Sequence, residues 1–579
     1  MRNLLLWMSL AACLGATTET YAQRSDQEKS FEDREFVSEY LAPTRIVCAD
    51  GLIQNADCLM EPFSGQVAIT DRNVAVFRST PDKKASILLD FGEEIHGRIQ
   101  IFQSMSPENK PVRFRLCLGE SVTEALSDVG REGTTATNDH AVRDLDILVP
   151  WLGMAESGNS GFRFARLDLL DCDKDVNIAA IRAVSRYRDI PWLGSFRCND
   201  ERLNEIWRVG ARTVHLNMQD YIWDGIKRDR LVWIGDMHPE ILAVNTVFGD
   251  HPLVRKSLDF IRDRTPQDRW MHDFESYSMW WILMQHHLYT WYGDLDYLAA
   301  QHDFMAAQLR KILDCVRSGR EDFKDGRFID WPTRRNPGVA HAGLQALAVM
   351  ALESGGEIMG ILKDTELQQA CLESARRMRE YVPDHLDNNQ AAALLGLSGL
   401  LDPHEAAQVI LANGPEGFAT FMGYSMLEAL ALDGKYAEAQ DLISAYWGAM
   451  LDLGATSYWE NFNYAEAAGA GRIDEIVPEG KYDIHADGGD HCYVGLRQSL
   501  CHGWGAGPTT WLSMRVLGIE PAALGFRKVR IRPHLGRLEW AEGSFPTPYG
   551  VIKVSHRKKA DGTVSSQIKL PKGIKLVKS

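Results

Sequence analysis

The sequence predicts a multidomain α+β protein in which a β-rich region, a helical region and a second β-rich region follow one another. Short runs of alternating apolar and polar residues dominate from about residue 30 to 188, and strand-like runs return after residue 518. Between them, apolar residues recur at helical spacing as far as about residue 515. The chain has 579 residues, which is too long for one ordinary domain, so we expect three or four.

Residues 1–22 have the features of an export signal. Arg2 precedes an apolar stretch over residues 4–12, and small side chains follow it up to Ala22. We therefore predict a signal peptide over residues 1–22 and export of the mature protein, to the periplasm in first place and to the cell surface or medium as alternatives. The run that ends at Cys13 also resembles a lipobox, so a lipid anchor at Cys13 is a second interpretation of the same segment.

Residues 23–195 are predicted to form a β-sandwich domain. The strand-like runs are residues 86–92, 97–102, 112–118 and 162–169. The last two alternate cleanly between apolar and polar residues, and turn residues separate all four. Short strands at this spacing favour a β-sandwich.

Residues 196–517 are predicted to form a helical domain. Asn199 or Asp200 is a suitable N-cap for a first helix, whose apolar residues from Leu203 to Val214 share one face. Further helical segments are residues 277–292, 305–316, 340–352, 367–381, 389–400, 403–411, 421–432, 437–450 and 508–516. So many helices joined by short loops form either a helical repeat array or a closed double ring. No fixed-period sequence repeat is visible, which weighs against the array.

Residues 518–579 are predicted to form a small C-terminal β-domain. The strand-like runs there are residues 528–533, 550–555 and 565–570. The net charge of −16 is spread thinly along the whole chain, without a long basic cluster. Because such a surface repels phosphate backbones, nucleic acid is excluded as a partner. After the first 20 residues or so, no apolar run approaches the length of a membrane span.

The cysteines do not indicate a disulfide scaffold or a structural metal. One of the ten lies in the predicted signal, at Cys13, and most of the others lie among apolar residues. Cys48 and Cys58 flank a short loop, and we expect that they can pair in an oxidising compartment. No CxxC pair and no histidine-rich spacing points to zinc, so the sequence predicts no metal site.

Three segments of the helical region combine acidic and aromatic residues where a plain core would be aliphatic. In residues 224–236, the carboxylates Asp224, Asp229 and Asp236 accompany Arg228 and Trp233. A helix would place Asp229 and Asp236 on one face, and a partly looped rim is an equal alternative because of the glycines. A surface helix with ion pairs is the common fate of such a charge run, but the apolar residues among the charges argue against full exposure.

The second and third segments are residues 454–462 and 499–507. Glu460 lies between Trp459 and Asn461, and a carboxylate among aromatic residues is costly to bury without a partner or a role. His502 lies in a glycine-rich run, where a ligand can approach the backbone closely. The alternatives are a locally paired Glu460 and a structural His502. Tryptophans considered as pocket walls are Trp270, Trp280, Trp281, Trp291, Trp331, Trp459 and Trp504. We expect at least half of them to fill the core instead.

At these three segments the chain resembles the α-L-rhamnosidases of glycoside hydrolase family 78. The first motif of that family reads approximately Asp-Cys-Pro-Gln-Arg-Glu-Arg-Leu-Gly-Trp-Thr-Gly-Asp. This chain matches it at Asp224, Arg228, Arg230, Leu231, Trp233, Gly235 and Asp236. The second motif, Gly-Ala-Thr followed by Trp-Glu, matches residues 454–460, and Ser-Leu-x-His matches residues 499–502. Residues 525–533 and 548–550 resemble the closing β-domain of the family, and residues 90–92 resemble its N-terminal β-domain.

The resemblance implies a fold, a reaction and roles for residues. The implied fold is an (α/α)6 barrel flanked by an N-terminal β-sandwich and a small C-terminal β-sandwich domain. The implied reaction is inverting hydrolysis that releases terminal α-L-rhamnose from plant or microbial polysaccharides or glycosides, without metal or organic cofactor. Asp229 is the implied general acid and Glu460 the implied general base. The implied substrate-binding residues are Asp224, Arg228, Asp236 and His502 for the sugar hydroxyls, with Trp233 and Trp459 against the ring and Trp331 and Trp504 as pocket walls.

Two departures from the family pattern keep alternatives open. Asp229 stands where the family has Glu, which shortens the reach of the acid by about one methylene. The acidic segment over residues 464–498 is longer than the corresponding segment of the family. One interpretation is that it remodels the mouth of the pocket. The first alternative is a hydrolase of the same fold for another deoxy sugar or a uronic acid. The second is a catalytically silent sugar-binding protein, and a polysaccharide lyase fits the acidic pair less well.

Overall fold

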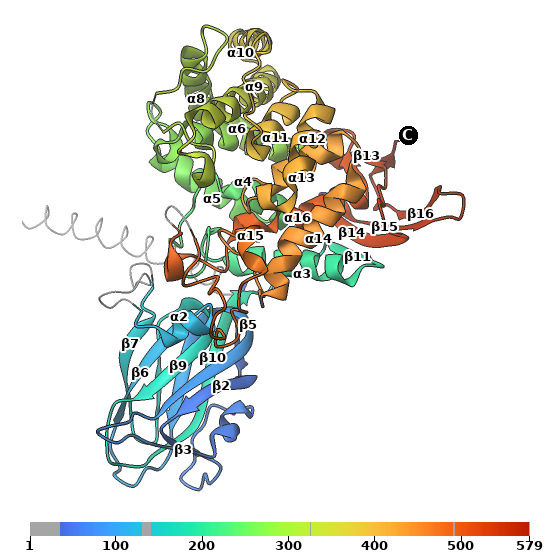
Figure 1. Ribbon diagram of the computed structural model, residues 1–579. Coiled ribbons are helices and arrows are strands. Elements are labelled where there is room, and N and C mark those ends of the chain that lie inside the picture. The colour runs from blue at the N-terminus through green and yellow to red at the C-terminus, as the bar shows by residue number, and fades with distance from the viewer. Residues whose placement is uncertain (1–34, 130–140, 325, 490–492, 578–579) are drawn as a thin grey trace, which may run out of the picture.

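The computed structural model describes residues 35–129, 141–324, 326–489 and 493–577 (Figure 1). An N-terminal β-domain, a helical domain and a C-terminal β-domain follow one another, and the C-terminal sheets lie against the side of the helical domain. The predicted multidomain α+β class is therefore confirmed. The predicted signal peptide over residues 1–22 and its Cys13 lie outside the described residues.

The N-terminal domain is one hydrogen-bonded network of ten strands around a core. The strands are β1 (Phe36–Leu41), β2 (Arg45–Asp50), β3 (Leu52–Gln54), β4 (Ala75–Arg78), β5 (Ser86–Gln103), β6 (Val112–Gly119), β7 (Asp144–Val149), β8 (Met154–Glu156), β9 (Ser160–Leu169) and β10 (Val176–Arg188). The sequence predicted two separate runs where the structure has the single strand β5. A bulge between Asp90 and Ile95, with Gly92 at φ +89°, bends β5 so that its first half pairs with β2 and its second half with β10. A short helix, α2 (Val122–Leu126), follows β6.

The helical domain is a closed double ring. The inner helices are α4 (Met237–Phe248), α6 (Glu275–Tyr292), α9 (Pro337–Ile361), α11 (Asn389–Leu397), α13 (Gly423–Leu432) and α16 (Gly507–Trp511). Each contacts the next in this order, and α16 returns to α4. The outer helices are α3 (Glu201–Asn217), α5 (Pro252–Arg264), α8 (His302–Cys315), α10 (Thr365–Met378), α12 (Pro403–Asn413) and α14 (Tyr436–Asp452). The alternation of inner and outer helices makes the (α/α)6 barrel that the family resemblance implied.

The two rings differ in their sequence pattern because they are buried differently. Almost every residue of α4 is buried, so apolar residues lie on all sides of that helix, and polar side chains such as Glu240 are buried among them. The outer helix α10 buries only one stripe, from Leu367 through Cys371 and Ala375 to Met378. The short helices α7 (Leu295–Ala300) and α15 (Tyr464–Ala467) complete the described helical domain.

The C-terminal domain is built from two small sheets. Their strands are β11 (Ser195–Cys198), β12 (Ile519–Pro521), β13 (Lys528–Ile531), β14 (Trp540–Thr547), β15 (Gly550–Lys558), β16 (Val564–Lys569) and β17 (Lys575–Leu576). One sheet has the order β11-β14-β15-β16 and the other β12-β13-β17. Because β11 precedes the barrel in sequence, the chain enters the helical domain through a strand of the C-terminal sheet.

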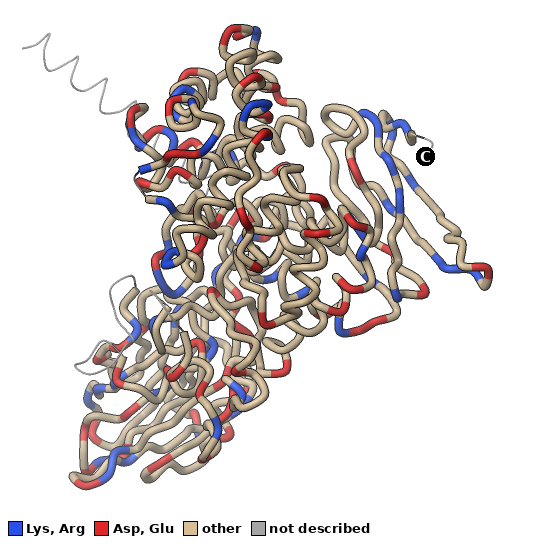
Figure 2. The backbone as a smooth tube through the Cα atoms, turned by 45° about the horizontal axis from the view of Figure 1, so that its top comes forward, with Lys and Arg blue, Asp and Glu red and all other residues tan. Residues whose placement is uncertain are grey.

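The charged residues and the cysteines bear on two of the predictions. Figure 2 shows Lys and Arg interspersed with Asp and Glu over all three domains. Among the described helices, none combines the length and the apolar character needed to cross a membrane. The predicted pairing of Cys48 with Cys58 is wrong, since both thiols are free. Cys48 packs beside Leu88 and Phe164, whereas Cys58 belongs to the main core of the N-terminal domain.

Candidate functional site

The three acidic and aromatic segments of the sequence meet at one pocket. Gly225 and His502 form a backbone bridge, and Gly503 N–H donates to the carbonyl of Asp224 over 2.8 Å. Glu460 N–H donates to the carbonyl of Ser499 over 2.9 Å, which brings in the third segment. The pocket has a volume of about 270 Å³ and is lined by Asp224, Arg228, Asp229, Trp233, Asp236, Phe274, Tyr277, Trp331, Glu460, Tyr493, Arg497, His502 and Trp504.

The segment before α4 is a loop and not a helix. Asp229 and Arg230 have φ values of +57° and +52°, in the left-handed region that side-chain-bearing residues rarely adopt. The loop is closed by Leu231 N–H, which donates to Asp224 Oδ1 over 2.9 Å. Strain of this kind costs about 1–3 kcal/mol for each residue and is typical of functional sites. The loop interpretation is therefore the right one of the two that the sequence left open.

One guanidinium joins two carboxylates in the pocket. Arg228 donates from Nη1 to Asp229 Oδ1 over 3.1 Å and from Nη2 to Glu460 Oε1. Glu460 also accepts from the backbone N–H of Ser499 over 3.0 Å, and it is 3% exposed. Asp229 also accepts from Trp233 Nε1 over 3.1 Å, and 18% of its side chain is exposed. Two carboxylates thus face one cavity, one deeply buried and the other nearer to solvent.

A buried histidine and two further carboxylates lie behind this pair. His502 Nε2 is 3.0 Å from Asp236 Oδ2. Burial alone would lower the pKa of His502, but the charges of Glu460, Asp236 and Asp224 raise it to about 9. Burial raises the pKa of Asp236, and raises that of Asp224 well above its usual range. The inner wall therefore holds a protonated histidine among carboxyl groups that differ in their affinity for protons.

Replacement of His502 by Gln is expected to remove part of the pH dependence of stability. In the wild type, the stabilisation from the protonated imidazole is fully present below the unfolded pKa of 6.5 and is lost as the pH rises through about 9. The melting temperatures of the wild type and His502→Gln should therefore differ most below pH 6.5 and converge toward pH 9. Thermal unfolding over this range checks the prediction, with the exposed His404→Gln as control. A difference that stays constant over the range would contradict it.

Aromatic rings form the walls of the pocket. Trp233 lies tilted against His272, with ring centroids 4.7 Å apart, and Trp504 stacks on Phe421 at 5.0 Å. Trp331 meets Tyr493 edge to face at 6.4 Å. Some of the lining side chains were not predicted from the sequence, namely Phe274, Tyr277, Tyr493 and Arg497. The acidic segment over residues 464–498 was the one available signal, since Tyr493 and Arg497 both come from it.

Trp459 departs from the predicted arrangement. Its ring is 1% exposed and packs edge-on against Phe462, with centroids 5.5 Å apart. Trp459 does not line the pocket, so it does not lie against a ligand ring as predicted. Tryptophans that belong to the core in the same way are Trp270, Trp280, Trp281 and Trp291.

A buried ionic cluster supports the loop next to Arg228. Lys227 is 2% exposed, and its Nζ lies 3.0 Å from Glu120 and 3.1 Å from Glu124 of the N-terminal domain. His485 Nε2 is 3.4 Å from the same nitrogen. Glu120 also accepts from the backbone N–H of Leu500 over 2.5 Å. Glu120, Glu124 and His485 are close enough together to hold a cation, and the ammonium of Lys227 lies in contact with all three. The N-terminal domain is therefore joined to two of the loops that form the pocket.

Comparison with known proteins gives family matches over two parts of the chain. The bacterial alpha-L-rhamnosidase 6 hairpin glycosidase domain matches residues 191–352. The bacterial alpha-L-rhamnosidase C-terminal domain matches residues 518–577. Among curated proteins, an alpha-L-rhamnosidase of Alteromonas sp. (strain LOR) is 23% identical over 83% of this chain. The match covers 54% of that protein, so the chain spans about half the length of this relative.

Solved structures share the fold. The GH78 family rhamnosidase of Bacillus sp. GL1 matches with a TM-score of 0.70 and 23% identity, over 88% of this chain and 54% of that one. A rhamnosidase from Klebsiella oxytoca with rhamnose bound matches with a TM-score of 0.65 and 20% identity, over 82% of this chain and 95% of that one. These likenesses extend across the β-domains as well as the double ring.

Proposed function

Because the chain carries the six-hairpin and C-terminal domains of the bacterial α-L-rhamnosidase family, glycoside hydrolase family 78, we propose that it hydrolyses terminal α-L-rhamnosyl linkages. The substrates are oligosaccharides, polysaccharides or glycosides that end in this sugar. The features of residues 1–22 support export, and we place the enzyme in the periplasm.

The observation that carries the proposal is the pair of carboxylates in one aromatic-walled pocket. Asp229 and Glu460 both face the cavity and both contact Arg228. An inverting glycosidase needs one carboxylic acid beside the leaving oxygen and one carboxylate that activates water on the opposite face of the ring. The pocket offers both groups, with aromatic rings for the apolar face of the sugar and charged groups for its hydroxyls.

Each group then has a role in the reaction. Glu460 accepts a proton from the attacking water, and its contacts with Arg228 and Ser499 N–H suit the carboxylate that a base requires. Asp229 delivers a proton to the leaving oxygen. The hydroxyls of the sugar are bound by Asp224, Arg228, Asp236 and His502, and its ring lies among Trp233, Trp331 and Trp504.

The environment of Asp229 makes its contribution depend on the leaving group. Arg228 and Trp233 each donate to a different oxygen of this carboxylate. A protonated Asp229 has to give up one of these contacts, since a carboxylic acid uses one oxygen as a donor. A substrate with a poor leaving group depends on this proton, because its leaving oxygen is strongly basic. A nitrophenolate is weakly basic and leaves with little protonation.

Replacement of Asp229 by Asn is expected to separate the two kinds of substrate. Hydrolysis of methyl α-L-rhamnoside should fall by about 10²- to 10⁴-fold, and hydrolysis of 4-nitrophenyl α-L-rhamnoside by roughly tenfold or less. Steady-state kinetics with both substrates measure this difference. Asp229→Glu is the matched control, because it keeps the acid and lengthens it by one methylene. Equal losses on both substrates would contradict the role of Asp229 as the acid.

Release of nitrophenol from 4-nitrophenyl α-L-rhamnoside by the wild type is the direct test of the proposed function. Turnover would support both the hydrolase activity and the rhamnose specificity. Because nitrophenolate leaves without much protonation, the assay depends on the pocket and the base and not on the acid. The absence of turnover would contradict rhamnose as the substrate and direct the assay to nitrophenyl glycosides of other deoxy sugars and uronic acids. If none of these glycosides is hydrolysed, a sugar-binding protein is favoured.

A further inference from the structure

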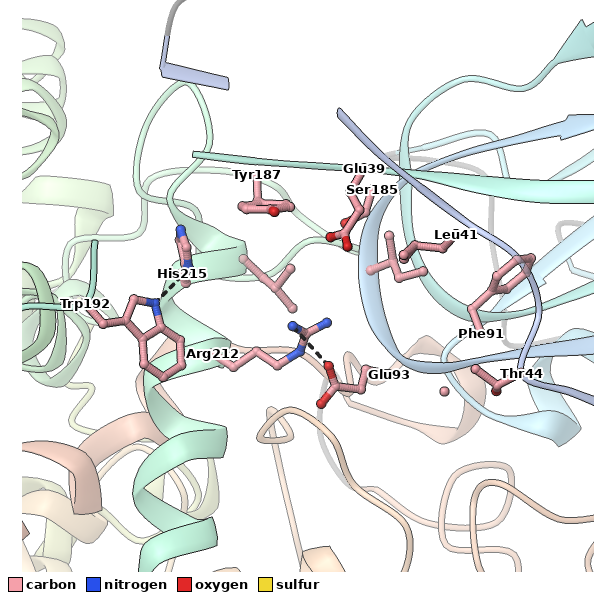
Figure 3. A pocket seen from close by; sticks show the side chains of 13 residues that line it. Glu39, Leu41, Thr44, Phe91, Glu93, Ser185, Tyr187, Trp192, Arg212 and His215 are labelled. Atoms are coloured by element: carbon pink, nitrogen blue, oxygen red, sulfur yellow. Dashed lines mark hydrogen bonds and ion pairs between the residues drawn. The ribbon is translucent and has the colours of Figure 1, made fainter. Parts of the chain in front are cut away.

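A second cavity, of about 530 Å³, lies between the N-terminal domain and helix α3 (Figure 3). Its volume falls within the range of roughly 300–1,000 Å³ that is common for small-molecule sites. Strands β1, β5 and β10 line one side, and α3 and Trp192 line the other. Leu216 lines the cavity and packs against Ile226 and Cys501, which lie in the loops beside the catalytic pocket. The two cavities are separate sites, since no described residue lines both.

One wall of this cavity is aromatic and held in place. The indole of Trp192 is 37% exposed, and its Nε1 donates to His215 Nδ1 over 3.1 Å. Burial lowers the pKa of His215 to about 4, so the ring is neutral and can accept this bond. His215 Nε2 in turn bonds the carbonyl of Arg188 over 2.7 Å, and Tyr187 lies edge-on to the imidazole. A fixed, partly exposed indole is suited to stack on the apolar face of a sugar ring.

The cavity also offers hydrogen-bonding groups, from α3 and from strands β1 and β5. Arg212 extends from α3 across the cavity toward Glu93, at 3.2 Å, and donates to the carbonyl of Glu94 over 2.7 Å (Figure 3). Its Nε is buried and has no hydrogen-bond partner among the described residues. Glu93 also contacts Arg208 at 3.1 Å, and Glu39 lies at the exposed rim.

The charges that face the cavity disfavour an anionic ligand. Glu39 and Glu93 face the cavity. Among the described lining residues, Arg212 is the one cationic side chain. Because Arg212 is already paired with Glu93, an incoming carboxylate or phosphate would meet net repulsion. A neutral polyhydroxyl ligand can use the same donors and acceptors without that penalty.

We propose that this cavity is a second saccharide-binding site, which takes a neutral mono- or disaccharide apart from the catalytic pocket. Trp192 stacks on the ring, Arg212 donates to a hydroxyl, and Glu39 and Glu93 accept from others. The choice of saccharides as the ligand class rests in part on the proposed function, whereas the preference against anions rests on the cavity alone.

Isothermal titration calorimetry of the full chain tests this site. The probes are methyl 1-thio-α-L-rhamnoside, which resists hydrolysis, the neutral disaccharides maltose and cellobiose, and digalacturonate as an anion. Each is titrated into the wild type, Trp192→Ala and Trp233→Ala, the last of which alters the catalytic pocket. Tyr549→Ala is the matched control, since it removes an exposed aromatic ring in the C-terminal domain. If Trp192→Ala fails to fold, Glu39→Ala replaces it, because that side chain is exposed at the rim.

The expected result is that at least one neutral probe binds roughly tenfold more weakly to Trp192→Ala, or to Glu39→Ala in its place. Its binding to Trp233→Ala and Tyr549→Ala should stay unchanged, as should turnover of 4-nitrophenyl α-L-rhamnoside by Trp192→Ala. Binding that depends on Trp233 alone would overturn the proposal, and so would a preference for digalacturonate or the absence of binding at millimolar concentrations. These outcomes differ from a failure of the proposed function. That failure would be a lack of turnover, whereas the second site is tested by binding that depends on Trp192.

Discussion

Replacement of Glu460 by Gln is expected to lower kcat for 4-nitrophenyl α-L-rhamnoside by about 10²- to 10⁴-fold, with little change in KM. The amide keeps the shape of the side chain but has no basic oxygen to take the proton of the attacking water. The hydrogen bonds of Glu460 with Arg228 and Ser499 N–H hold the side chain in the cavity, and the amide oxygen can still accept one of them. The loss should therefore fall on the chemical step. Steady-state kinetics on the purified variant provide the measurement.

Glu357→Gln is the matched control for this variant, because that carboxylate is exposed on α9, where it pairs with His286 over 2.9 Å. Its kcat should equal that of the wild type. A Glu460→Gln protein that is folded and keeps more than about a tenth of wild-type kcat would rule out Glu460 as the base.

Replacement of Lys227 by Met is expected to destabilise the protein by about 3–5 kcal/mol, because it leaves the buried carboxylate of Glu120 without its cation, while Glu124 keeps its ion pair with Arg143. Lys227 contacts Glu120 and Glu124 at 3.0 and 3.1 Å, and both carboxyl groups are buried. Methionine has a similar length, so the loss is one of charge and hydrogen bonds and not of volume. The midpoint of thermal unfolding and its dependence on urea measure the change.

A double-mutant cycle makes this prediction specific. Glu120→Gln in the Lys227→Met background removes the uncompensated charge, so the double variant should be more stable than Lys227→Met alone. Lys559→Met, at an exposed position of the C-terminal domain, should leave the midpoint unchanged. A double variant less stable than Lys227→Met would show that the ion pair is not what the lysine contributes.

One-sided burial made some elements recognisable in the sequence, although fully buried ones such as α11 and β9 were predicted too. The alternating run in β6 and the apolar stripe of α10 were both recognised, because each shows its buried face as a period. Helix α4 was missed, since it is buried on all sides and has no polar face to set a period. The amphipathic α5 beside it was also missed, although its apolar stripe is visible in the sequence.

The sequence predicted the site residues that belong to motifs. It did not predict those that only the fold brings to the pocket. Asp229, Glu460 and His502 come from motifs, and the structure gathers them in one pocket. Tyr493 lines the same pocket but lies in a segment that resembles no motif. Lys227 was part of a charge run that most often lies on the surface, and only the approach of the N-terminal domain shows that it is buried. Such contacts depend on how distant parts of the chain meet.

In the proposed mechanism, Asp229 and Glu460 act on opposite sides of an α-L-rhamnosyl bond by direct displacement. Proton NMR of the reaction mixture, recorded before the released sugar equilibrates, tests it most directly. The account predicts that β-L-rhamnose forms first and that the α anomer appears later by mutarotation. Formation of α-L-rhamnose first would mean retention of configuration, and it would contradict the assignment of Glu460 as a base that activates water.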